Sequence, residues 1–144
     1  WLALQQSLAV PQVLTALVLG WAIPRLVHGF IGERLAVRSW GSAARLLFVV
    51  LWDIIVSNIT VARIVLSPWS DPQPAWVPIR LDVRHPTAIT LLATIITTTP
   101  GTVSCIVDDE RRLILVHALD CTDPAAMARD IKQRYEVPLG EIFG

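Results

Sequence analysis

Residues 46–66 read LLFVVLWDIIVSNITVARIVL, and this stretch decides what kind of protein the sequence encodes. It is long enough to cross a bilayer as a helix, since about 20 mostly apolar residues span the hydrocarbon core. Its polar side chains recur every three or four residues, at Asp53, Ser57, Thr60, Arg63 and Ser67. A helix places residues at this spacing on one face. The stretch therefore predicts an apolar helix with one polar stripe.

The two charges of this stripe argue against an ordinary span. A lone Asp or Arg at mid-bilayer costs about 2.5–3.5 kcal/mol on insertion scales. Asp53 and Arg63 lie ten residues apart, too far for an intrahelical pair. We therefore expect an interfacial or steeply tilted helix, with a full third crossing as the alternative. Asp53 and Arg63 are candidates for docking the helix on a partner or for lining an ion path, and docking is favoured.

A second membrane segment precedes this helix. Residues 13–27 read VLTALVLGWAIPRLV, and residues 1–10 look like the last turns of an earlier helix that starts upstream. A turn at residues 7–12 would join the two as a membrane hairpin. Basic and histidine side chains follow, at Arg25, His28, Arg34, Arg38 and Arg45. Arginines near a membrane helix favour the cytoplasm for this loop.

The composition agrees with a membrane protein. Of 144 residues 53% are apolar and 17% charged, and the mean hydropathy is +0.56; soluble domains carry about 25% charge. Residues 1–67 hold five Arg against two acids, and residues 68–144 hold ten acids against seven basic residues. All six Trp lie in the first 76 residues, as expected near lipid headgroups. No basic run interleaved with aromatics is present, so nucleic-acid binding is not expected.

The second half predicts a small α+β domain after a proline-rich linker. Residues 77–84 alternate as a half-buried strand, Pro86 opens a helix through about Thr98, and 103, 105 and 107 alternate as a second strand. Residues 108–112 form a charged hairpin turn before a central strand at 113–119. Asp123-Pro124 begins a last helix that Pro138 should stop. The order βαββα is most of a ferredoxin-like unit, and 139–144 is barely long enough for a final strand.

Motifs for chemistry are weak. Thr99-Pro100-Gly101-Thr102 is best explained as a turn that ends one helix and starts a strand. His117, Asp120 and Cys121 lie close in sequence to the end of a strand, but no ligand set with recognised metal spacing is present, so neither metal nor cofactor is expected. His85 is interpreted as a surface or cap residue. Cys105 and Cys121 are too far apart for a CxxC motif and are expected to be small buried residues.

Residues 89–120, ITLLATIITTTPGTVSCIVDDERRLILVHALD, together with Val65-Leu66-Ser67-Pro68, closely resemble the E subunit of the multisubunit Mrp (Mnh/Pha) sodium/proton antiporter. The Thr-Pro-Gly-Thr turn, the acidic hairpin and Val116-His117-Ala118 are its most specific matches. The resemblance covers essentially the whole chain. It implies an accessory subunit without a catalytic residue, in which sodium and protons are handled by the complex.

We thus expect membrane-embedded or interfacial helices at 1–67 and a small cytoplasmic domain at 68–144. The expected protein is not an enzyme. It lies in a bacterial plasma membrane as a multi-pass subunit that supports assembly and ion exchange with other antiporter subunits. The alternative is a membrane-tethered regulatory or small-ligand-binding module.

Overall fold

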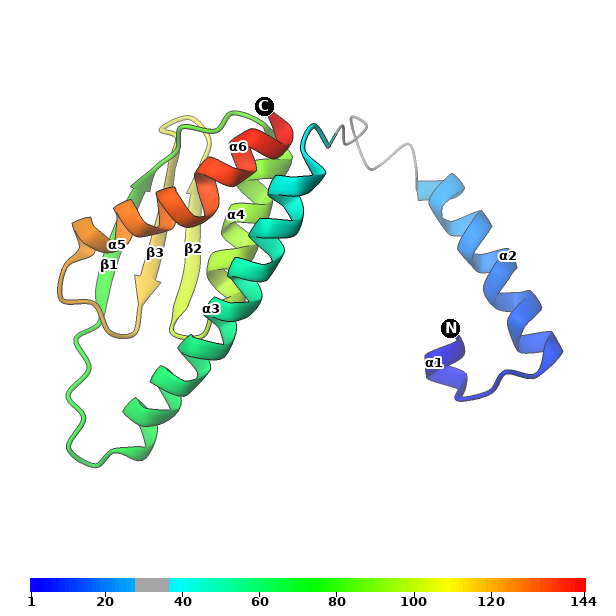
Figure 1. Ribbon diagram of the computed structural model, residues 1–144, viewed down its shortest axis with the longest axis horizontal. Helices are drawn as coiled ribbons and strands as arrows, with labels where there is room; N and C mark the ends of the chain where they lie inside the picture. The colour runs from blue at the N-terminus through cyan, green and yellow to red at the C-terminus, as the bar shows by residue number, and fades with distance from the viewer. Residues whose placement is uncertain (28–36) are drawn as a thin grey trace. The chain divides into compact units, whose positions relative to one another are not determined.

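The computed structural model describes residues 1–27 and 37–144 and divides into two compact units, 1–35 and 36–144 (Figure 1). His28 and Arg34, predicted to lie in a cytoplasmic loop, are outside the described residues.

The N-terminal unit is a helical turn followed by one long helix. Helix α1 (Leu2–Gln5) ends at Gln6, whose φ of 46° reverses the chain, and α2 (Val10–Val27) follows. Pro11 lies in the first turn of α2, where a missing backbone N–H costs nothing. None of the residues of α2 is buried within the described chain, and its 18 residues would be about 27 Å long, close to the thickness of a bilayer core.

Helix α3 (Trp40–Leu66) opens the second unit, and together with α2 it is one of the two described helices that are long and apolar enough to cross a membrane. The side chain of Ser39 caps it by accepting from the backbone amide of Ser42 at 3.2 Å. The helix thus begins six residues before the predicted start, and Arg45 lies within it rather than in the preceding loop. The error arose because the small and polar residues 40–45 carry little apolar signal, although nothing in them breaks a helix.

The two long faces of α3 have different surroundings. Leu46 and Asp53 are buried against the rest of the unit. The opposite side, which we name the bare face of α3, consists of Phe48, Trp52, Ile55 and Ile59, each about half exposed or more. A soluble helix would not leave so continuous an apolar stripe uncovered.

Three antiparallel strands form the sheet in the order β1-β3-β2. They are β1 (Ala75–Arg80), β2 (Thr102–Asp108) and β3 (Leu113–Ala118). The central position predicted for the third strand is confirmed. One face of the sheet makes the core, with fully buried side chains at Val77, Ile79, Ile114, Val116 and Ala118.

Two strand predictions need correction. The strand predicted at 77–84 ends at Arg80, because side chains bind the backbone of residues 81–83 instead. The alternation predicted at 103, 105 and 107 is broken by a bulge between Ser104 and Ile106. An extra residue in a bulge shifts the side chains that follow it to the other face. Cys105 is consequently exposed and not buried as expected, and both cysteines are free.

Four helical elements cover the core face of the sheet. They are α4 (Pro86–Thr98), α5 (Pro124–Ile131), the π-turn η1 (Lys132–Glu136) and α6 (Val137–Phe143). The bounds predicted for α4 and the Asp123 cap of α5 are confirmed. Pro138 does not stop the last helix, and residues 139–144 add no strand. Pro138 falls in the first turn of α6, just after the π-turn, a position at which proline is tolerated.

Candidate functional site: a polar latch between α3 and the C-terminal helices

Asp53 of α3 meets Arg134 and Tyr135 of η1, and we name these three residues the polar latch. The Tyr135 hydroxyl donates to Asp53 Oδ2 at 2.7 Å, and Arg134 Nε donates to the same oxygen at 3.3 Å. Arg134 Nη2 pairs with the other carboxylate oxygen. Asp53 is 9% exposed, so its charge is compensated at a nearly dry contact.

The π-turn presents two consecutive side chains to the same partner. A π-turn inserts one extra residue into a helix and changes the direction of the side chains around it. Tyr135 is buried, while Arg134 keeps 41% of its side chain exposed and also approaches Asp130 at 3.8 Å. The latch therefore has a buried acid, a buried hydroxyl and a cation that reaches the surface.

Burial and the neighbouring charge of Asp53 shift the pKa values of Tyr135 and Arg134. Burial raises the pKa of Tyr135, and the hydrogen bond to Asp53 and the charge of Asp53 raise it further. For Arg134, burial lowers the pKa, but the charge and hydrogen bond of Asp53 outweigh it, and the net pKa is raised. Tyr135 thus stays a neutral donor and Arg134 stays a cation at neutral pH.

The Thr99–Thr102 turn gives α3 a further contact. Thr102 Oγ1 donates to the carbonyls of Ile96 at 2.7 Å and Thr99 at 3.0 Å, which joins the end of α4 to the start of β2. Gly101 has a φ of +90°, and a methyl group placed there would come within 3.2 Å of Val61 Cγ2. The turn therefore needs glycine both for its backbone and for its approach to α3.

A cavity of about 420 Å³ lies between these two contacts. Asp53, Ser57 and Thr60 line it from α3, and the Thr99–Thr102 turn, Asp120 and Asp130 line it from the opposite side. The structure thus brings Asp53 and the turn to one site. Arg63 is not part of it: the residue is exposed on α3 and forms no ion pair with the described residues.

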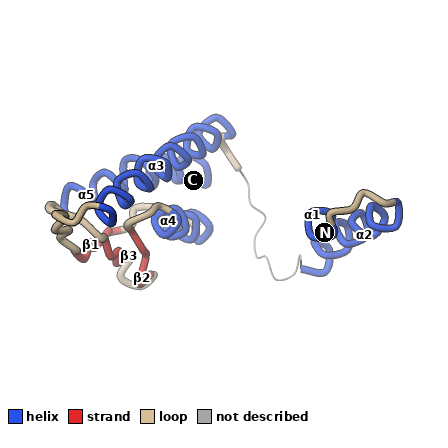
Figure 2. Tube along the Cα trace, turned by 90° about the horizontal axis from the view of Figure 1, so that it is seen from below, coloured by secondary structure: helices blue, strands red, loops and turns tan. Residues whose placement is uncertain are grey.

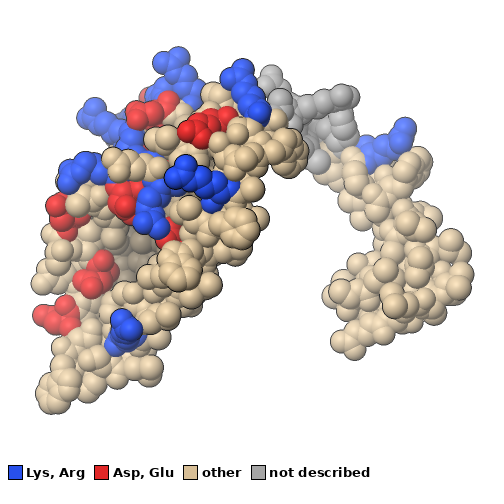
Figure 3. Space-filling view, in the orientation of Figure 1, with Lys and Arg blue, Asp and Glu red and all other residues tan. Residues whose placement is uncertain are grey.

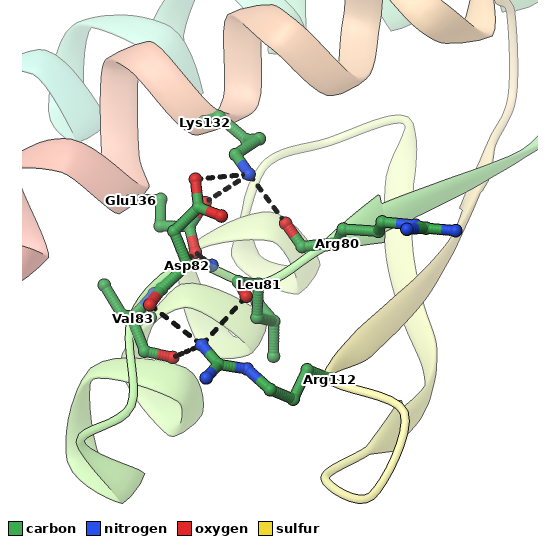
Figure 4. Close-up of polar contacts among 7 residues, drawn as sticks. All are labelled: Arg80, Leu81, Asp82, Val83, Arg112, Lys132 and Glu136. Carbon is green, nitrogen blue, oxygen red and sulfur yellow. Dashed lines mark hydrogen bonds and ion pairs between the residues drawn. The ribbon is translucent and has the colours of Figure 1, made fainter.

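Sequence reasoning missed a second polar cluster, which fixes the chain after β1 (Figure 4). Glu136 Oε1 accepts from the amides of Asp82 at 2.6 Å and Val83 at 3.1 Å. One Arg112 nitrogen, Nη2, donates to the carbonyls of residues 81, 82 and 83 at 2.9, 2.8 and 3.1 Å. Lys132 Nζ lies 2.6 Å from Asp82 Oδ2 and 3.6 Å from Glu136 Oε2. The one available sequence signal was the four-residue spacing of Lys132 and Glu136.

The histidines have structural contacts. His85 Nδ1 accepts from the amide of Thr87 at 3.2 Å, which confirms the predicted cap, and its ring stacks on Phe143. His117 lies on a strand face against Trp76, with ring centroids 5.0 Å apart. Among the residues that the structure describes, no three His, Cys, Asp or Glu side chains gather as metal ligands.

The comparisons with known proteins decide the family. The family model described as MNHE, Na+/H+ ion antiporter subunit, matches residues 1–142. The chain belongs to this family. The E subunit of a Na(+)/H(+) antiporter of Alkalihalophilus pseudofirmus is 30% identical, and the match covers 99% of this chain and 90% of that protein. The E subunit of a probable K(+)/H(+) antiporter of Rhizobium meliloti is 31% identical over 99% of this chain and 89% of its own length.

A solved structure has a matching fold. One chain of the membrane-bound sulfane sulfur reductase, an archaeal respiratory membrane complex, has a TM-score of 0.70 and 27% identity. The match covers 99% of this chain and 92% of that one. The MNHE family is one of transporter components, so the predicted membrane antiporter subunit is confirmed in preference to the tethered ligand-binding module.

Proposed function

We propose that this member of the MNHE family is an accessory subunit that holds the antiporter together at the membrane surface, with no ion path and no catalysis of its own. Its relatives bear names with Na+ and with K+, so the exchanged ion is proposed as a monovalent cation. The polar latch is proposed to dock α3 on the C-terminal helices.

The observation that carries this proposal is the length over which the C-terminal part contacts α3. Ser42 Oγ donates to Glu141 at 2.7 Å, Asp53 belongs to the latch, and Val61 lies against Gly101. From 42 to 61 the helix rises about 28 Å, nearly the full hydrocarbon thickness. An upright α3 would draw Arg134 and its charged neighbours into lipid at about 2.5–3.5 kcal/mol each. We therefore place α3 in the interface, with its bare face in lipid.

The surface of the unit supports this orientation. Figure 3 shows charged side chains over the helical layer of residues 75–144, and a long, mostly uncharged surface along α3 that one basic side chain interrupts. Arg38 and Arg45 near the start of α3, and Arg25 at the end of α2, favour the cytoplasmic side under the positive-inside rule. We propose a multi-pass bacterial plasma membrane protein whose residues 1–67 meet lipid and whose residues 68–144 lie in the cytoplasm.

We also propose that the cytoplasmic part is a ferredoxin-like unit that lacks its last strand. The order β1-α4-β2-β3-α5, with β3 between β1 and β2, follows that pattern. The continuation into η1 and α6 replaces the last strand and is what brings Arg134 and Tyr135 to α3.

Replacement of Asp53 by alanine tests the docking role. We expect the amount of assembled complex and the cation/proton exchange of inverted vesicles to fall together, so that exchange per assembled complex is unchanged. Arg63→Ala, on the same helix but exposed, is the control and should alter neither quantity. A fall in exchange per assembled complex would place Asp53 in the ion path, and unchanged assembly would exclude docking.

A further inference from the structure

The sheet has a second face that no helix covers within residues 37–144. All four C-terminal helical elements and α3 lie on the core side. The residues of the other side, which we name the open sheet face, are Trp76, Pro78, Val103, Ile106, Leu113, Leu115 and His117. Trp76 and Ile106 are each 56% exposed, and Val103 is 39% exposed. Apolar residues at this density on one sheet face mark an interaction surface.

Charge is confined to one end of the open sheet face. Arg80 and Asp108 are both paired in register with Leu113, so they flank that end. The other end holds the edge-to-face pair of Trp76 and His117, with Val103 beside them. An occupant of this surface must therefore be apolar and uncharged over most of its contact area, with Trp76 as its natural anchor.

A partner strand is not that occupant, because both sheet edges are blocked. The amide of Leu81 donates to the carbonyl of Arg112, so even-numbered residues of β1 direct their backbone groups outward. Pro78 is one of these and has no N–H, and the outward carbonyl of Arg80 accepts from Lys132 Nζ at 2.8 Å. On β2 the outward amide of Ser104 donates to Thr97 at 3.1 Å, next to the bulge.

The bilayer is not the occupant either. Figure 2 shows the strands on one side of this unit, with α4 and α5 next to them and α3 beyond the helices. Consistent with this, α3 packs on α6 and η1. When the bare face of α3 rests in lipid, the open sheet face consequently points away from the membrane and into water.

We propose that the open sheet face binds an apolar, uncharged surface of another subunit of the same antiporter outside the bilayer. This inference rests on the proposed interfacial position of α3. The chain belongs to a family of antiporter subunits, so such a partner exists in the assembly. The subunit is then a bridge with two opposite contact surfaces, one for lipid on α3 and one for protein on the sheet.

Site-specific photocrosslinking in the intact complex tests the contact without altering the fold. A photoreactive amino acid replaces Ile106 on the open sheet face or, as the matched control, Val137 of α6, which is 55% exposed. We expect Ile106 to give an adduct with another antiporter subunit, identified by mass spectrometry, at a yield at least about tenfold above that at Val137. Adducts with lipid only, with a second copy of this chain only, or none at all would overturn the proposal.

Charge substitution on the open sheet face gives an independent measurement. It distinguishes the proposed protein contact of the sheet from the proposed lipid contact of α3. Ile106→Glu should lower the co-purified antiporter subunits by at least about tenfold while the tagged subunit stays in the membrane fraction. Val137→Glu should alter neither. Unchanged co-purification with Ile106→Glu would contradict the sheet contact alone. Failure of the proposed lipid contact of α3 would appear differently: brominated lipids would not quench Trp52 on its bare face in a single-tryptophan variant, while α2 would still hold the subunit in the membrane.

Discussion

Asp53 and Arg134 differ in how easily water reaches them, with 11% and 41% of their side chains exposed. Loss of Arg134 leaves a buried carboxylate with only Tyr135, whereas loss of Asp53 leaves a cation that can turn to solvent. Removing one partner of a buried ion pair, so that the other charge stays buried without compensation, costs about 3–5 kcal/mol. We therefore expect Arg134→Met to lower the free energy of unfolding by about 3 kcal/mol and Asp53→Leu to lower it by less.

Chemical denaturation of the purified subunit in mild detergent measures this asymmetry. The double variant Asp53→Leu/Arg134→Met should recover part of the free energy of unfolding that Arg134→Met loses, because no charge is then left buried without a partner. Arg63→Met, an exposed arginine of the same helix, should change stability by no more than about 0.5 kcal/mol. Equal losses for the two single variants would mean that the latch is solvated.

Tyr135 makes the stability of the folded subunit decrease at alkaline pH. Its pKa is raised above the ordinary value of 10.0, first by burial and then by Asp53. Above about pH 10 the native state holds a proton on Tyr135 that the unfolded state loses. The free energy of unfolding therefore falls as pH rises above this value, and the stabilisation is fully present below it. Thermal unfolding of the subunit in detergent from about pH 8 to pH 11 should show this fall, and Tyr135→Phe should show a smaller one.

Lys132 contributes to the same fall in the free energy of unfolding at alkaline pH. Its contribution is the part of the fall that remains in the Tyr135→Phe variant. Burial lowers the pKa of Lys132, but the hydrogen bond to Asp82 and the charges of Glu136 and Asp82 outweigh it, and the net pKa is raised above 10.5. Its contribution is likewise present below about pH 10.5 and lost above it. An identical pH slope in wild type and Tyr135→Phe would contradict the role given to the tyrosine.

At the scale of elements, the Thr99–Thr102 turn depends on Gly101. Alanine there would hold a φ of +90° and press its methyl against Val61. We expect Gly101→Ala to lower the free energy of unfolding by at least about 1 kcal/mol. Gly41→Ala is the matched control, since a methyl group at that position in α3 meets nothing within 4 Å. It should be neutral or stabilising by up to about 1 kcal/mol, and thermal unfolding measures both.

Elements with local signals could be predicted from the sequence, and those fixed by distant contacts could not. Pro86 and Asp123 mark helix starts through backbone chemistry within a few residues, so α4 and α5 began where expected. Arg134 meets Asp53 across 81 residues, and no periodicity carries that information. The continuation through Pro138 likewise depends on the π-turn, and the end of β1 on a buried Glu136 that binds the next two amides. The local sequence pattern carries no information about contacts between residues far apart in the chain.

At the scale of the whole molecule, Trp40 and Trp52 report how α3 lies. They are 12 residues apart, which is about 18 Å along a helix. For an interfacial helix we expect both to be quenched most strongly by lipids brominated at the same shallow depth. Single-tryptophan variants of the full chain, with the other Trp replaced by Phe, provide the measurement. A Trp52 quenched far deeper than Trp40 would instead establish a crossing helix, and Trp69 beyond the end of α3 provides a further depth marker.

The distance along the chain between the two halves of the latch sets an order of events during biosynthesis. Arg134 leaves the ribosome 81 residues after Asp53, and at about 5–20 residues per second that interval is roughly 4–16 s. Through this time the carboxylate needs hydration, which the headgroup layer supplies and the hydrocarbon does not. In the proposed interfacial position of α3, the nascent helix settles at the membrane surface first, and the later helices close over it from the water side.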